Sequence, residues 1–115
     1  LWYFKDSSST SENIVLEEIK PDKQPIGKSD DAKPFTSHTL NLNKGAIIYL
    51  FTDGYIDQFG GETNKKFKSK QLKILLQKIA HQKLSEQKES LIVSFETWKG
   101  KYEQIDDICI IGIQI

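Results

Sequence analysis

The chain has 115 residues, of which 37% are hydrophobic and 28% charged, and its 16 Lys and Arg residues balance 16 Asp and Glu residues. This composition is sufficient for one folded domain with a core and argues against wholesale disorder. Nucleic-acid-binding proteins usually carry a basic excess or a basic face, so the balanced charge argues against a nucleic-acid partner. No apolar stretch approaches the ~20 residues that cross a bilayer, so we expect no membrane contact in this segment.

The single cysteine and the two chain ends bear on the compartment and on the domain organisation. Cys109 lies in an apolar run, which predicts a buried thiol, and one cysteine cannot form an internal disulfide. This usage fits a reducing compartment, so we expect a cytoplasmic location. The chain opens on apolar residues 1–4 and closes on the apolar run 108–115. Because proteins rarely begin and end inside core strands, we interpret residues 1–115 as one domain excised from a longer chain.

The first half of the chain carries patterns typical of strands. Residues 1–4 and 14–19 predict a hairpin with a long polar tip. Residues 21–34 contain all three prolines and predict a surface loop. The alternating polarity of residues 35–42 predicts a half-buried or edge strand. Residues 46–52 are almost continuously apolar, which is typical of a strand covered on both faces.

The period changes to that of helices after residue 68. One apolar stripe at helical spacing consists of Leu72, Leu75, Leu76, Ile79 and Ala80, and a second of Leu91, Ile92, Phe95 and Trp98. Ser69 and Ser85 are the predicted N-terminal caps of these two helices, and Gly100 is the predicted end of the second.

Residues 108–115 predict a last strand, so the element order is four strands, two helices and one strand. This order predicts an α+β fold, with a largely antiparallel β-sheet and two antiparallel helices on one face. The second face of strand 46–52 finds no cover among these residues. An exposed apolar sheet face promotes self-association, which makes a second copy of the chain a candidate partner.

Two acidic clusters mark the candidate site. Asp53 follows the most apolar strand directly, and Asp106 lies just before the last strand. If these strands are antiparallel neighbours, the two aspartates meet at one edge of the sheet, where strands lie about 4.8 Å apart. Carboxylate oxygens are hard ligands that suit Mg²⁺ or Mn²⁺. Gly54 would allow a sharp backbone turn beside the ion.

The spacing of these acidic residues is also compatible with a simpler interpretation, in which they bind no metal. Asp-Gly after a strand is a common turn, and the pair Asp106-Asp107 before a strand is typical of a solvated loop.

The longer motifs resemble one family. Residues 45–58, "GAIIYLFTDGYIDQ", resemble the pattern in which an apolar strand leads into "TDG" or "SDG" with an acid four residues after the first Asp. Residues 102–115, "YEQIDDICIIGIQI", resemble the closing pattern "Q-x-DD" followed by an apolar strand. With "KPDKQPIG" at residues 20–27 and the linking segment 59–76, the likeness covers nearly the whole chain. The chain thus resembles the C-terminal half of a metal-dependent (PPM, or type 2C) serine/threonine protein phosphatase of the stage II sporulation protein E branch, whose fold is an α-β-β-α sandwich.

This resemblance implies roles for individual residues. Asp53 and Asp106 match the family's metal ligands. Asp57 matches an additional acid that contacts metal-bound water or an extra metal, and Gly54 and Asp107 match neighbouring positions that either contact the metal or support its ligands. The implied cofactors are Mn²⁺ or Mg²⁺, with two ions in the complete domain.

The resemblance also implies the reaction. The family uses no side-chain nucleophile; a water bridging two metals attacks the phosphorus of a phosphoserine or phosphothreonine. Ala46 and Cys109 depart from the family pattern at positions that are not ligands. The acids of the family's first half do not occur in residues 1–115, so we expect this chain alone to bind metal weakly and to turn over little or no substrate.

Other polar features have simpler explanations. His38 and His81 have no further His or Cys at ligand spacing, so we expect solvated or hydrogen-bonded side chains. The basic run at residues 65–70 is either a solvated loop or a positively charged surface that attracts a phosphorylated substrate. Gly60-Gly61 is either a mobile flap over the site or a plain linker.

Two hypotheses of function follow. The first is the output domain of a bacterial signalling protein that dephosphorylates a regulatory phosphoprotein, such as an anti-sigma-factor antagonist. The second is a non-catalytic pseudophosphatase or protein-docking module whose aspartates only form turns.

Overall fold

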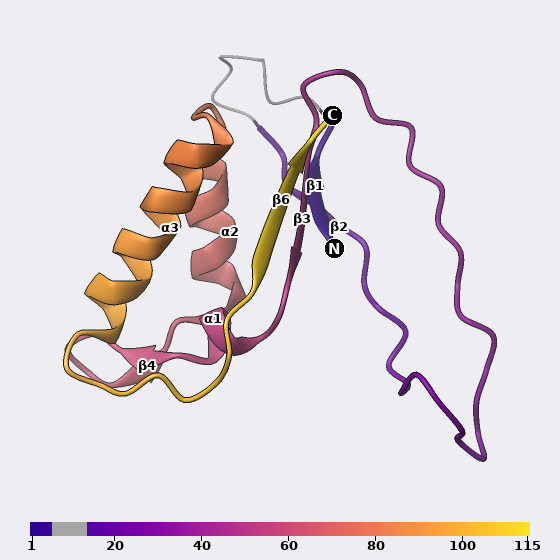
Figure 1. Cartoon of the computed structure of the whole chain (residues 1–115), viewed down its shortest axis with the longest axis horizontal. Coiled ribbons are helices and arrows are strands. Elements are labelled where there is room, and N and C mark those ends of the chain that lie inside the picture. Colours follow the sequence, from indigo (N-terminus) through magenta and orange to yellow (C-terminus); the bar gives the residue numbers. More distant parts are fainter. Residues whose placement is uncertain (6–13) are drawn as a thin grey trace.

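The computed structural model describes residues 1–5 and 14–115 and shows a sheet with helices packed on one side (Figure 1). The tip of the predicted first hairpin, residues 6–13, lies outside the described residues. The elements in chain order are β1 (Trp2–Phe4), β2 (Glu17–Glu18), β3 (Ile47–Phe51), α1 (Gly54–Asp57), β4 (Phe59–Gly60), β5 (Lys65–Lys66), α2 (Lys68–Ile79), α3 (Leu84–Lys99) and β6 (Ile110–Gln114).

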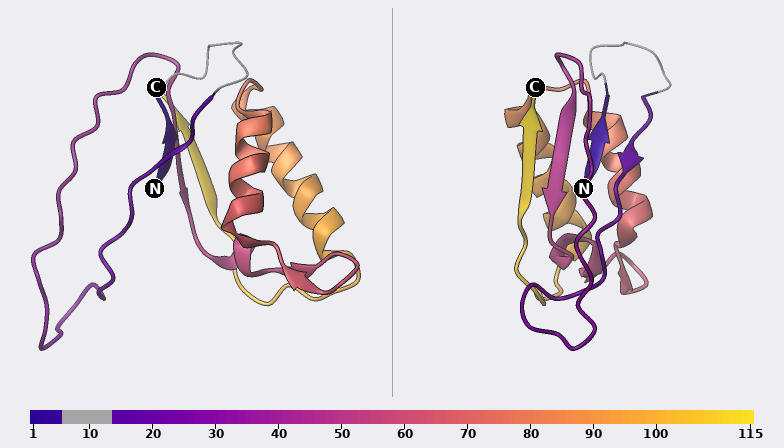
Figure 2. Two further views of the ribbon diagram at one scale, coloured as in Figure 1. Left: turned by 180° about the vertical axis from the view of Figure 1, so that it is seen from behind. Right: turned by 90° about the vertical axis from the view of Figure 1, so that its right-hand side faces the viewer.

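The main sheet has four strands in the order β2-β1-β3-β6, and each neighbouring pair is antiparallel. Helices α2 and α3 form a hairpin that covers one face of this sheet (Figure 2). A small second sheet consists of β4 and β5. The predicted α+β fold with a largely antiparallel sheet and two antiparallel helices on one face is therefore confirmed. The described residues supply one sheet layer and one helix layer.

The core lies between the sheet and the helix hairpin. Alternate side chains of β1 and β3 point to the helices, where Trp2, Phe4, Ile47 and Tyr49 are 3% exposed or less. They meet the predicted helical stripes through Leu72, Leu76 and Ile79 of α2 and Leu91 and Phe95 of α3. Burial raises the pKa of the Tyr49 hydroxyl, which donates a hydrogen bond of 2.6 Å to Oε1 of the buried Gln87. This hydrogen bond joins the middle of the sheet to α3.

Both predicted helix caps are wrong, whereas the predicted end of the second helix is confirmed. Ser69 and Ser85 lie inside α2 and α3. The first turn of α3 is closed instead by Glu86, whose carboxylate accepts a hydrogen bond of 3.1 Å from the backbone N–H of Lys83, so no serine cap is needed there. Gly100 ends α3 with φ +52°, and its N–H donates to the carbonyl of Glu96.

The predicted strand at residues 35–42 is also wrong. This segment belongs to a long arm, residues 20–45, which extends from the sheet on the side away from the helices (Figure 2). Its backbone has no strand partner in the described part of the chain, and an alternating sequence forms a strand only when a neighbouring strand pairs with it. The two limbs of the arm are linked by Asp22, whose carboxylate accepts hydrogen bonds from the N–H and hydroxyl of Thr36.

The sheet face turned away from the helices is only partly covered. Leu50, Ile111 and Ile113 are 42%, 49% and 43% exposed. Strand 46–52 is therefore buried on one face and not on both, because the described residues supply a helix layer on one side only. The expected burial of Cys109 is wrong for the same reason, since its thiol is exposed. Among the described residues, no helix has the length and apolar character to cross a membrane.

The helix–sheet contact predicts unequal effects of two substitutions in α2. Leu76 is fully buried, so Leu76→Ala is expected to lower the free energy of unfolding by about 2–5 kcal/mol. Ile74 is 56% exposed, so Ile74→Ala is expected to change it by about 0.5 kcal/mol or less. Urea denaturation followed by circular dichroism measures both values, and equal losses would contradict the described packing.

Candidate metal centre

The end of β3 and the start of β6 lie at the same end of the sheet. The antiparallel register places Phe51 opposite Ile110, so the chain leaves β3 where it enters β6 (Figure 1). Asp53 and the acidic segment Asp106-Asp107 follow and precede these strand ends. The predicted antiparallel arrangement is thus confirmed, and it brings together backbone segments that are 53 residues apart in the sequence (Asp53 to Asp106).

Thr52 fixes these two segments to each other. Its N–H donates to the carbonyl of Cys109 at 3.0 Å, and its Oγ1 accepts from the N–H of Cys109 at 3.1 Å. The same hydroxyl donates to the carbonyl of Asp107 at 3.3 Å. One threonine therefore extends the ladder beyond the last strand pair and holds the acidic segment beside the β3 end.

Gly54 allows the two backbones to approach closely. A Cβ at this position would lie 2.1 Å from the carbonyl oxygen of Asp107, a separation that real Cβ atoms do not show. Gly54 is the first residue of α1 and has no positive φ. The glycine is therefore required for close contact with Asp107 and not, as the sequence suggested, for a sharp turn.

The Asp53 and Asp106 carboxylates are exposed to solvent. Asp53 occupies the N-cap position of α1 without a side-chain capping hydrogen bond. Oδ1 of Asp106 accepts from the N–H of Asp107 at 2.8 Å, and the Asp106 carbonyl accepts from Nε2 of Gln104 at 2.8 Å. Asp106 is thus oriented locally, while Asp107 contributes its backbone groups to the Thr52 and Asp106 contacts.

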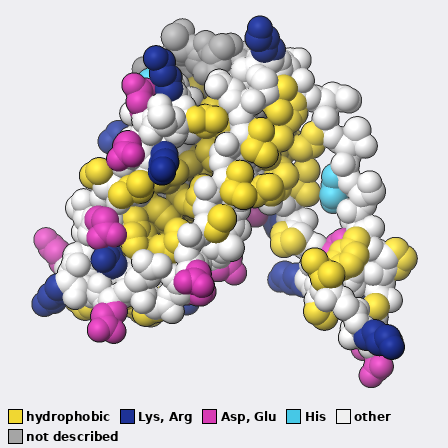
Figure 3. Space-filling view, in the orientation of Figure 1, with side chains coloured by type: hydrophobic (Ala, Val, Ile, Leu, Met, Phe, Trp, Pro, Cys, Tyr) yellow, Lys and Arg dark blue, Asp and Glu magenta, His cyan; other side chains and the backbone are white. Residues whose placement is uncertain are grey.

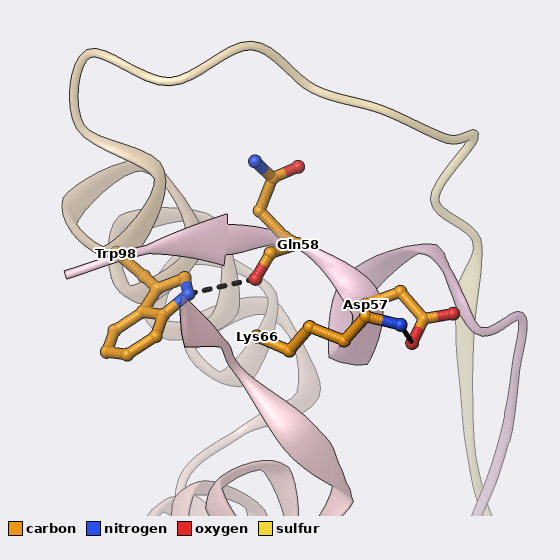
Figure 4. A network of polar contacts seen from close by, with 4 residues as sticks. All are labelled: Asp57, Gln58, Lys66 and Trp98. Carbon is orange, nitrogen blue, oxygen red and sulfur yellow. Dashed lines mark hydrogen bonds and ion pairs between the residues drawn. The ribbon is translucent and has the colours of Figure 1, made fainter. Parts of the chain in front are cut away.

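Asp57 is engaged with a lysine of the basic run. Oδ1 of Asp57 lies 3.1 Å from Nζ of Lys66 across the space between α1 and β5 (Figure 4). Both side chains are at least 40% exposed, so this ion pair contributes little to stability. The ion pair orients the Asp57 carboxylate toward β5.

Gln58 is a supporting residue that the sequence did not indicate. Its side chain is fully buried, and Nε2 donates to the carbonyls of Phe59 and Glu103 at 3.0 and 2.8 Å. The backbone carbonyl of Gln58 accepts a hydrogen bond of 3.0 Å from the indole N–H of Trp98 (Figure 4). Gln58 thereby connects the end of α1, helix α3 and the segment that leads to Asp106. The sequence gives no indication that Gln58 is buried, because a glutamine after an acidic motif is usually exposed.

The glycine pair Gly60-Gly61 lies in a packed hairpin. A Cβ on Gly60 would lie 1.9 Å from the carbonyl oxygen of Trp98, and the N–H of Gly61 donates to that carbonyl at 2.9 Å. Phe67, which follows β5, makes edge-on aromatic contacts with Tyr55 and with Trp98, and the ring centroids lie 5.2 and 5.5 Å apart. The pair is therefore neither the flap nor the plain linker that the sequence left open.

The donor set at this rim fits part of a divalent-cation site. Two aspartates provide hard oxygen ligands of the kind that Mg²⁺ and Mn²⁺ prefer. Residues 1–5 and 14–115 hold no group of three or more His, Cys, Asp or Glu side chains placed to bind a metal. The ligand roles of Asp53 and Asp106, and the supporting roles of Gly54, Asp57 and Asp107, remain predictions.

Comparison with known proteins adds two findings. The family model described as stage II sporulation protein E (SpoIIE) matches residues 9–115. Among solved structures, the SiaA-PP2C domain of Pseudomonas aeruginosa is similar, with a TM-score of 0.80 and 26% sequence identity. The match covers 99% of this chain and 42% of that one, so the chain spans less than half of the solved relative. No curated protein matched.

The Thr52 contacts predict a stability difference between two substitutions. Thr52→Val keeps the shape but removes the hydroxyl, so we expect it to lower the free energy of unfolding by about 1–2 kcal/mol. Thr52→Ser retains the hydroxyl and is expected to cost less than about half of that. Urea denaturation of both variants makes the comparison, and a Ser variant as unstable as the Val variant would argue against the hydroxyl's role.

Proposed function

Because the chain belongs to the stage II sporulation protein E family of PP2C-type phosphatases, we propose that it is part of a metal-dependent phosphatase acting on phosphoserine or phosphothreonine. The observation that carries this proposal is the meeting of the Asp53 and Asp106 segments at one rim of the sheet. Two carboxylates at such a rim repel each other in the absence of a cation. A divalent ion between them would convert that repulsion into binding energy.

In this proposal Asp53 and Asp106 hold Mn²⁺ or Mg²⁺. When bound, such ions supply Lewis acidity toward the phosphate and a water nucleophile at neutral pH. Thr52 and Gly54 keep the two ligand-bearing segments at a fixed spacing. Asp107 supports this arrangement through its backbone, and Asp57, paired with Lys66, is available as an outer acid that orients water near the ion.

The chain supplies a partial set of ligands in this proposal. It spans 42% of the solved relative, and its described residues form no group of three metal-binding side chains. Catalysis therefore requires further acids from elsewhere in the phosphatase domain. We propose that the phosphatase domain is the cytoplasmic output domain of a larger signalling protein. Its substrate would be a phosphorylated regulator such as an anti-sigma-factor antagonist.

A non-catalytic docking module is the second candidate. It is favoured by the incomplete donor set among the described residues and by the ion pair that engages Asp57. In that case the aspartates serve only as turn residues, and the arrangement of α1 against the last strand is a structural feature.

Turnover by the full-length protein separates the two candidates. We expect Asp53→Asn and Asp106→Asn each to lower Mn²⁺-dependent phosphopeptide hydrolysis by at least roughly 100-fold, since changes beyond the direct ligands already cost 10–100-fold. Asp30→Asn, at an exposed position in the arm, is the matched control and should leave the rate unchanged. Full activity of either site variant would remove that residue from the ligand set.

Metal binding by the 115-residue chain provides an independent check. Two carboxylates without further ligands should bind Mn²⁺ weakly, in the millimolar range, by calorimetric titration. Asp53→Asn should abolish even this binding. Tight binding at a one-to-one ratio would contradict the partial site.

A further inference from the structure

The ion pair between α1 and β5 involves an acid that lies close to a candidate metal ligand. Nζ of Lys66 is 3.1 Å from Oδ1 of Asp57 (Figure 4). The N–H of Asp57 donates to the carbonyl of Asp53 at 2.9 Å, so one helical turn relates the two aspartates. Residues four apart on a helix project from the same side, with about 5–6 Å between their Cβ atoms. The lysine therefore binds the acid nearest to Asp53 along α1.

The hairpin of β4 and β5 sets the position of Lys66. The antiparallel register places Lys66 opposite Phe59, and the N–H of Phe67 donates to the carbonyl of Gln58 at 3.0 Å. Nζ of Lys66 also lies 5.9 Å from the centroid of the Phe59 ring, within the range of a cation–π contact. Backbone pairing and a ring contact thus place the ammonium beside Asp57, in addition to the attraction between the two charges.

The lysine competes with a divalent ion for the same carboxylate. An ion held by Asp53 would attract Asp57 from one turn away, and the Lys66 ammonium opposes this because two cations near one carboxylate repel each other. Exposed ion pairs are weak, so the lysine biases the carboxylate without locking it. A carboxylate has two oxygens, so Asp57 can keep Oδ1 on Lys66 and accept a hydrogen bond from water with the other.

We propose that Lys66 is a positioning residue that keeps Asp57 out of the coordination sphere of an ion held by Asp53 and Asp106. This inference rests on the proposed metal centre and assigns one of the two roles that the sequence left open for Asp57, an acid that binds water beside the ion. Loss of the ammonium lets the Asp57 carboxylate bind the ion directly. The metal is then held more tightly, whereas turnover falls because the water loses its acceptor.

The neighbouring lysine separates this role from a general effect of charge. The end of the molecule around α1 and β4 carries both acidic and basic side chains (Figure 3), so removal of any lysine there changes the local field. Lys65 and Lys66 are both exposed and adjacent in β5, and successive side chains of a strand point to opposite faces. Lys65→Gln therefore removes the same charge as Lys66→Gln without breaking the pair with Asp57.

Mn²⁺ binding by the full-length protein is the first test. The electron paramagnetic resonance signal of free Mn²⁺ measures binding without turnover, and Asp53→Asn identifies the binding that depends on the proposed centre. We expect Lys66→Gln to lower that dissociation constant by about two- to fivefold, the factor that corresponds to an exposed ion pair. Lys65→Gln is expected to change it by less than about 1.5-fold. Circular dichroism controls for folding. Equal effects of the two variants, or weaker binding in Lys66→Gln, would overturn the role of Lys66.

A double-variant cycle tests whether Lys66 acts through Asp57. In an Asp57→Asn background the carboxylate charge is absent, so adding Lys66→Gln should leave the Mn²⁺ dissociation constant unchanged within about 1.5-fold. A Lys66→Gln effect of the same size in both backgrounds would show that the lysine acts independently of Asp57, contrary to the proposal.

Turnover at saturating Mn²⁺ distinguishes positioning from substrate binding. Lys66→Gln is expected to lower kcat for a phosphopeptide by about tenfold, the lower end of what residues beyond the direct ligands contribute, with KM within about twofold of its original value. A raised KM with unchanged Mn²⁺ affinity would identify Lys66 as a contact for the substrate and overturn the proposal.

Failure of this inference can be told apart from failure of the metal centre. Mn²⁺ binding that is the same in Asp53→Asn and in the unsubstituted protein would overturn the proposed centre and the role of Lys66 with it. Binding that is lost in Asp53→Asn but responds equally to Lys65→Gln and Lys66→Gln would overturn the role of Lys66 alone.

Discussion

The antiparallel ladder between β3 and β6 is the constraint on which the candidate site depends. It places the end of one strand beside the start of the other, so that Asp53 and Asp106 reach the same rim. Thr52 continues the ladder with its hydroxyl and ties Cys109 and Asp107 to the β3 end. Without this pairing the two acidic segments would be unrelated parts of a long chain.

The rim is supported by contacts of the buried residues Gly54 and Gln58. Gly54 packs against the Asp107 carbonyl, and Nε2 of Gln58 donates to the Glu103 carbonyl. The indole N–H of Trp98, a residue of α3, donates a hydrogen bond to the backbone carbonyl of Gln58. These hydrogen bonds are partly buried and cost more to break than the exposed Asp57–Lys66 pair. The position of the aspartates therefore depends more on the residues below them than on the charges around them.

The surfaces that remain open share one cause. The described residues provide one helix layer, so the opposite sheet face has no helix over it, and they provide no strand that pairs with residues 35–42. Each of these segments has a sequence suited to pairing or burial.

The sequence alone determined the elements whose periodicity is strong. The stripes of Leu72, Leu76 and Phe95 predicted both helices, and the apolar runs around β3 and β6 predicted the paired strands, because burial of one face leaves a repeating pattern. The spacing of the aspartates around these strands predicted the candidate rim. Only the tertiary structure decided the rest. Gln58 is buried because Glu103 and Trp98 meet it there, Gly54 is needed because Asp107 lies against it, and residues 35–42 form no strand because pairing requires a neighbour. These outcomes depend on contacts between distant segments, and no local pattern records them.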